Sequence, residues 1–76
     1  MKFSLLETVV LQKDLPEKHL CRGDIGAIVE IYEPDGIEVE FVTGSGQAQA
    51  LVTLKPDDVR LVSGADILSV RSLDAA

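Results

Sequence analysis

The chain has 76 residues, with 13 acidic side chains against 7 basic ones, a formal net charge of −6 and a hydrophobic fraction of 46%. This length suits one small domain, and the hydrophobic fraction is too high for a disordered chain. A negative chain repels phosphate backbones and anionic lipids, which argues against nucleic acid and membranes as partners. The single cysteine, Cys21, excludes an internal disulfide framework and fits a reducing compartment. Because no apolar run reaches the length of a membrane span and no signal-peptide core opens the chain, we expect a cytoplasmic protein.

Short runs rich in β-branched and aromatic residues follow one another along the chain, separated by turn-forming residues. No run before residue 63 keeps the 3.6-residue periodicity of a helix. The pattern therefore predicts five strands, at residues 7–11, 25–33, 37–43, 47–54 and 59–62.

Two connections complete this pattern. Residues 12–22 form a polar loop in which Leu15 and Leu20 can anchor the chain to the core. Residues 55–58 read Lys-Pro-Asp-Asp, and Pro56 with the acids after it predicts a single 3₁₀ turn before the last strand.

These elements predict an all-β fold, a small five-stranded SH3-like barrel over residues 1–62. Residues 63–76 begin with a turn and then carry four apolar side chains, with a spacing that suits either a short helix or an extended segment. We expect this stretch to be a loosely packed or disordered C-terminal tail.

Two turns set the register of the central strands. If Pro34-Asp35-Gly36 is a three-residue loop with Gly36 in the left-handed conformation, Ile31 faces Val39. If Gly44-Ser45 is a two-residue loop, Val39 also faces Ala50. Both turns predict the same inward-facing set, which is Ala27, Val29, Ile31, Ile37, Val39, Phe41, Ala48, Ala50, Val52 and Leu54.

The same register places acids on the outer face of the hairpin. Glu30 falls opposite Glu40, and Tyr32 falls opposite Glu38, while Asp24, Glu33 and Asp35 lie at the hairpin ends. Like charges directly across an antiparallel pair are destabilising, so a fold selected for stability alone would place a basic residue at one of them. The candidate partner-binding residues are Glu30, Tyr32, Glu33, Asp35, Glu38 and Glu40.

Two interpretations of this acidic surface stay open. In the first, it attracts a protein partner with a basic surface. In the second, Arg22, Lys55 or Arg60 lies beside the glutamates, and the surface is a solvated mosaic of charges.

Catalytic and metal chemistry has little support. His19 is the only imidazole and Cys21 the only thiol, and two such ligands do not hold a structural metal. No nucleophile, base and orienting group can be assembled from them. We therefore expect a protein that is not an enzyme and has no cofactor and no metal; its oligomeric state is left open.

The chain resembles a known family in the motifs RGDIGAIVEIY at residues 22–32, IEVEF at 37–41, LVTL at 51–54 and DDV at 57–59. It looks like a small bacterial, largely cyanobacterial, domain of unknown function, over about residues 5–62. Its glycines, strands and closing turn are also similar to the SH3-like barrels of electron-transport accessory proteins, such as a small photosystem I subunit and the ferredoxin–thioredoxin reductase variable chain. The resemblance implies no catalytic residue.

This resemblance implies two roles. Some members of the unknown-function family look like partners of neighbouring toxin-like proteins, which implies an antitoxin or immunity-type binder. The electron-transport likeness implies instead an accessory subunit of a redox or photosynthetic complex, but that photosystem subunit docks acidic carriers through basic residues, whereas this hairpin is acidic. The first hypothesis is therefore a non-enzymatic, acidic protein–protein interaction module, and the accessory subunit is the alternative.

Overall fold

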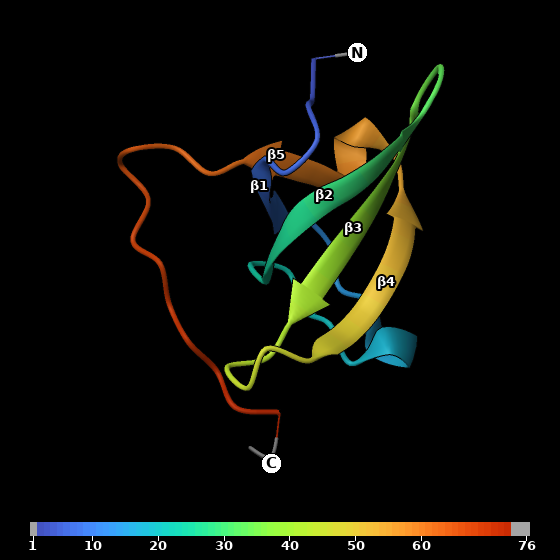
Figure 1. Cartoon of the computed structure of the whole chain (residues 1–76). Coiled ribbons are helices and arrows are strands. Elements are labelled where there is room, and N and C mark those ends of the chain that lie inside the picture. Colours follow the sequence, from blue (N-terminus) through green and yellow to red (C-terminus); the bar gives the residue numbers. More distant parts are fainter. Residues whose placement is uncertain (1, 74–76) are drawn as a thin grey trace.

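A single antiparallel sheet of five strands makes up most of the fold in the computed structural model, which describes residues 2–73. The strands are β1 (Thr8–Leu11), β2 (Ile25–Tyr32), β3 (Gly36–Val42), β4 (Ala48–Leu54) and β5 (Val59–Leu61), arranged in the order β4-β3-β2-β1-β5 (Figure 1). Two 3₁₀ turns, η1 (Pro16–Lys18) and η2 (Pro56–Asp58), lie in the connections. The predicted all-β fold is confirmed, as is the 3₁₀ turn directly before the last strand.

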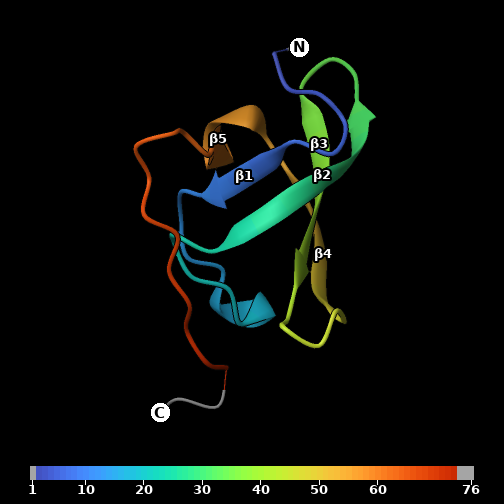
Figure 2. The ribbon, with the colours of Figure 1, turned by 60° about the vertical axis from the view of Figure 1, so that its left-hand side comes forward.

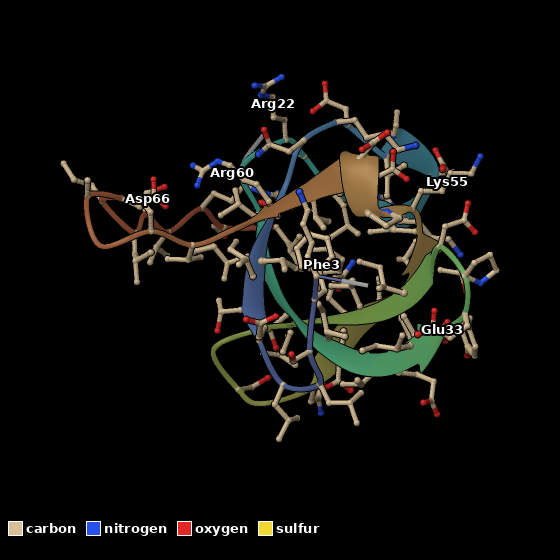
Figure 3. All side chains as sticks on the ribbon, turned by 90° about the horizontal axis from the view of Figure 1, so that it is seen from above. Phe3, Arg22, Glu33, Lys55, Arg60 and Asp66 are labelled. Carbon is tan, nitrogen blue, oxygen red and sulfur yellow. The ribbon has the colours of Figure 1, made fainter. Side chains whose placement is uncertain are left out.

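The sheet curves strongly around the core, and Phe3 lies over one end of the core (Figure 3). Among the described residues no ladder joins β4 to β5, so the hydrogen-bonded sheet is open between these two strands. The backbone N–H of Gln12 donates to the carbonyl of Asp58 at 2.8 Å, which ties the end of β1 to η2 beside this opening.

The core is wholly apolar, and none of the polar or charged side chains of residues 2–73 is buried. Leu20 is buried and Leu15 packs against the core, so the loop between β1 and β2 is anchored as predicted. The buried cluster comprises Phe3, Val9, Leu11, Leu20, Ile28, Ile37, Val39, Phe41, Val52, Leu54 and Val59.

The predicted register between β2 and β3 is wrong. The hairpin loop is residues 33–35, because Tyr32 pairs with Gly36, which belongs to β3 and does not have a positive φ. A Cβ atom at Gly36 would lie 3.2 Å from the Cβ atom of Tyr32, so this glycine permits close packing and is not needed for a left-handed turn.

A β-bulge in β2 changes which of its side chains are buried. Ile28 pairs with Val39 and Glu30 pairs with Glu38, which leaves Val29 as the extra residue. An extra residue reverses the inward and outward alternation beyond it. Ile28 is therefore fully buried, whereas Val29 is 36% exposed.

The predicted loop between β3 and β4 is also wrong. Thr43 donates its N–H to the carbonyl of Gln47 at 2.9 Å, and Gly46, at φ 85°, takes the left-handed position. A second irregularity leaves Gln49 as an extra residue, so that Phe41 pairs with Ala50 and not with Ala48.

The predicted inward-facing set is only partly confirmed. Ile37, Val39, Phe41, Val52 and Leu54 are buried. Ile31 and Ala50 pack against the core while partly buried. The prediction is wrong for Ala27, Val29 and Ala48, because Ala27 alternates with the buried Gly26 and Ile28, and the other two are exposed.

The tail beyond β5 has no helix or strand up to residue 73 and runs along one side of the sheet (Figure 2). Its apolar side chains stay in solvent, with Ile67 93% and Val70 99% exposed. Two ion pairs hold it, Arg60 with Asp66 at 2.8 Å and Arg71 with Asp24 at 2.6 Å. This agrees with the expected loose packing, and residues 74–76 lie outside the described part.

Gly26 provides a test of how tightly β2 and β3 pack. A Cβ atom there would lie 2.6 Å from Cγ1 of Val39 and 2.9 Å from the carbonyl oxygen of Glu40. We expect Gly26→Ala to lower the free energy of unfolding by about 1–3 kcal/mol, the usual cost of overpacking a core. Urea denaturation measures it.

The matched control is Gly44→Ala, where a Cβ atom meets nothing within 4 Å and φ is not positive. If the two substitutions change the free energy of unfolding equally, the close approach of β3 at Gly26 is not what disfavours a larger side chain at that position.

Candidate functional site

The alternation of side chains along β3 creates the candidate site. Ile37, Val39 and Phe41 are at most 3% exposed and point into the core. Glu38 and Glu40 lie between them in the sequence and therefore point to the opposite face of the sheet. Both remain partly exposed, so their charges are available at the surface.

Two glutamates face each other across β2 and β3, although not the predicted pair. Glu30 lies opposite Glu38, while Glu40 lies opposite Ala27 on one side and Leu51 on the other. The predicted pairing of Glu30 with Glu40 is wrong because the three-residue hairpin loop lies one residue earlier than predicted, and the bulge at Val29 then places Glu40 opposite Ala27. A like-charge cross-strand pair is nevertheless present, one residue pair closer to the hairpin tip.

The carboxylate of Glu38 is oriented by two hydroxyl groups. Thr53 Oγ1 donates to Glu38 Oε1 at 2.6 Å from the neighbouring strand β4, and Tyr32 Oη donates to the same oxygen at 3.4 Å. Thr53 lies directly opposite Glu38 in the β3–β4 ladder. The carboxylate of Glu38 is therefore oriented toward β4, the strand at this edge of the sheet.

Tyr32 is 46% exposed and lies among these acids. Partial desolvation, the charge and hydrogen bond of Glu38, and the charge of Glu30 together raise the pKa of Tyr32 above its ordinary value. The phenol therefore stays protonated and remains a hydrogen-bond donor at physiological pH.

Glu33 and Asp35 occupy the tip of the hairpin and are both exposed. Glu33 projects from the rim of the sheet, away from Phe3 (Figure 3). The structure thus brings Glu30, Tyr32 and Glu38 into one cluster. Glu40 lies two residues further along β3, and Glu33 and Asp35 lie at the hairpin tip. We call these six residues the acidic face.

No ion pair among residues 2–73 involves the acidic face. The three that occur join Lys13 to Asp58, Arg60 to Asp66 and Arg71 to Asp24. Asp24, expected at one end of the acidic hairpin, is instead neutralised by Arg71.

Two of the three cations considered for a charge mosaic lie elsewhere. Arg60 is paired with Asp66, and Arg22 donates from Nη1 to the carbonyl of Gln12 at 3.4 Å. Both lie across the molecule from Glu33 (Figure 3). Lys55, the third candidate, makes no ion pair with the acidic face within the described part of the chain.

Exposed apolar side chains border the acidic face. Leu51 on β4 is 53% exposed and sits opposite Glu40, and the bulged Val29 lies next to Glu30. Sequence reasoning missed both, together with Thr53. The alternation along β4 was a usable signal for Leu51 and Thr53, but a bulge has no single-residue signature that would have exposed Val29.

A groove separates the tail from the end of the sheet. Its walls include Ile25, Phe41 and Val42 on the sheet side and Val70 and Leu73 on the tail side. Arg71 also lines it and donates from Nε and Nη2 to the carboxylate of Asp24 and from Nη2 to the carbonyl of His19. The hydrogen bond from Arg71 is the main cause that lowers the pKa of Asp24.

Cys21 and His19 are exposed, and the thiol is free. Among residues 2–73 no three His, Cys, Asp or Glu side chains come together in a way that could hold a metal ion. The same part of the chain has no helix with the length and apolarity needed to cross a membrane.

A comparison with protein-family models finds a match, over residues 5–61, to the family described as "Domain of unknown function (DUF4926)". The match spans all five strands. The chain belongs to the DUF4926 family. Comparisons of this DUF4926 chain with curated proteins and with solved structures find no significant match. The similarity to SH3-like electron-transport proteins and the bacterial origin therefore stay predictions.

The environment of Tyr32 provides a direct test of the cluster. The chain has one tyrosine and no tryptophan, so the absorbance of the phenolate reports Tyr32 alone. We expect Glu38→Gln to lower the pKa of Tyr32, because it removes a negative charge that opposes ionisation of the phenol. Glu17→Gln, on η1, is the control, and an equal shift in both variants would contradict the described contact.

Proposed function

We propose that this DUF4926 domain is a non-enzymatic protein-binding module whose acidic face engages a basic surface on a partner protein. The observation that carries the proposal is the direct opposition of Glu30 and Glu38, neither of which is in an ion pair within residues 2–73. A contact of this kind costs stability, within the roughly 0.2–1 kcal/mol that cross-strand pairs are worth. A cationic partner would relieve that cost on binding.

The surroundings of the acids support a protein partner over a small cation. Tyr32 offers an exposed ring and a phenol that stays protonated. Tyrosine is enriched among the few residues that contribute most of the binding energy at protein interfaces. Val29 and Leu51 add apolar area beside the charges. A basic partner with apolar side chains between its lysines or arginines fits such a mixed surface.

We further propose that binding masks the basic surface of the partner, which is what an antitoxin or immunity-type protein would do. Acids at an exposed surface mainly raise the rate of association and select the partner, so the complex should weaken as salt rises. The free, exposed thiol of Cys21 suits a reducing compartment, and we place the complex in the cytoplasm. No feature of the described residues favours the alternative of an electron-transport accessory subunit.

Charge reversal tests this function. We expect Glu30→Lys/Glu40→Lys to lose the partner that the unmodified domain captures by affinity purification after crosslinking in its native host. The reason is that four units of charge change on the face that would meet the partner's cations. Quantitative mass spectrometry of the captured proteins measures the loss, and circular dichroism verifies the fold.

Glu17→Lys/Asp57→Lys is the matched control, since it changes the net charge equally at residues of η1 and η2 that are not part of the acidic face. The proposal predicts that this control retains the partner. Equal capture by both double variants, or equal loss from both, would refute the role of the acidic face.

A further inference from the structure

Strand β4 is an edge strand that lacks most of the usual protection of such strands. It is seven residues long and forms one border of the sheet (Figure 1). Within residues 2–73, its backbone forms hydrogen bonds to β3 and to no other segment. The outward N–H and C=O groups of an edge strand are a ready template for another strand.

The composition of β4 strengthens this observation. The strand reads Ala-Gln-Ala-Leu-Val-Thr-Leu and contains no charged residue, proline or glycine, in a chain that is otherwise rich in charge. Natural proteins blunt their edges with short strands, lysines, prolines, bulges or covering loops, and of these β4 has only the irregularity at Gln49, near its beginning. The opposite edge, β5, follows that rule, because it has three residues and includes Arg60.

The charge next to β4 indicates what can pair with it. Glu38 is held toward β4 by Thr53, and Glu40 lies one strand in, opposite Leu51. A second copy of the chain, with a net charge of −6 and the same acids beside its own edge, would bring two negative surfaces together. A strand from a basic protein meets the opposite condition.

We propose that β4 is a docking edge, onto which an extended segment of a basic partner adds as a sixth strand. Successive side chains of that segment point to opposite faces, so lysine or arginine at every second position would lie on the outer face, beside Thr53 and the oriented carboxylate of Glu38. Backbone hydrogen bonds supply affinity in this mode of recognition, and side chains supply specificity.

The geometry permits the charge contact. Neighbouring strands are about 4.8 Å apart, so the backbone of the added strand lies about 10 Å from the backbone of β3. A long basic side chain of the partner and the carboxylate of Glu38, which is inclined toward the edge, can together span that distance. The partner's basic character rests on the proposed function, whereas pairing along the edge does not.

Short peptides test the edge directly. The probe is a capped peptide of about eight residues in which lysine and valine alternate, long enough to cover β4. We expect it to slow hydrogen exchange of alternate amides in residues 48–54 by about fivefold or more, as each gains a hydrogen bond. NMR of the isotopically labelled full chain measures the exchange of each amide.

Two backbone-modified versions of the peptide separate strand pairing from attraction between charges. One carries N-methyl groups on its lysines and the other on its valines, so both keep every charge and each removes the donors of one edge of the strand. Strand addition predicts that only one of the two loses binding. If all three peptides bind alike and leave β4 unprotected, the edge proposal is wrong while the acidic face can still bind cations.

Two further outcomes distinguish a basic partner from other occupants of β4. A peptide that alternates serine and valine should protect β4 less well; equal protection would overturn the basic character of the partner and leave the edge standing. If the protein without peptide already protects the outer amides of β4 and sediments as a dimer, a second copy occupies the edge and the proposal is overturned.

Discussion

The alternation of side chains along β3 is the constraint on which the surface of this protein depends. Ile37, Val39 and Phe41 form the centre of the core, and their burial forces Glu38 and Glu40 to the outer face. Shifting the strand by one residue would bury two carboxylates without cations, at a cost far above any gain from repacking. The position of the acids therefore follows from the burial of three apolar side chains.

The rest of the site elaborates this arrangement. Tyr32 from β2 and Thr53 from β4 both donate to Glu38, which fixes one carboxylate from either side. The three arginines are engaged elsewhere, Arg60 and Arg71 in holding the tail and Arg22 on the loop before β2. Lys55 makes no ion pair with the acidic face within residues 2–73. The result is a surface whose negative charge is directed toward an unpaired strand edge, and both features call for the same kind of partner.

The sequence was informative wherever a rule about side-chain alternation or turn chemistry applied locally. Strand locations, the 3₁₀ turn at Pro56 and the inward side of β3 could all be predicted, because each depends on neighbouring residues. The register could not, because it depends on the position of each hairpin loop and on two irregularities, at Val29 and Gln49, that local composition does not mark. Gly36 and Gly46 show why: the left-handed glycine was assigned to the first hairpin but occurs in the second, while Gly36 is needed for contact with Tyr32.

The errors in register had a limited effect on the predicted site. Its six residues are all exposed or partly exposed, because a two-residue shift preserves the face on which a side chain lies. The partner of each residue changed, however, and with it the chemistry of the site. The contact of Glu38 with Thr53, which links the acids to β4, became visible only in three dimensions.

The most direct test of this account is the effect of Glu30→Lys on stability, measured by urea denaturation at low salt against Glu17→Lys as the control. If the Glu30–Glu38 contact is an uncompensated repulsion, the substitution replaces it with an opposite-charge pair, and the free energy of unfolding should rise by up to about 1 kcal/mol relative to the control. A free energy of unfolding that falls, or that changes no more than in the control, would mean that the charge of Glu30 is already balanced, and it would contradict the account.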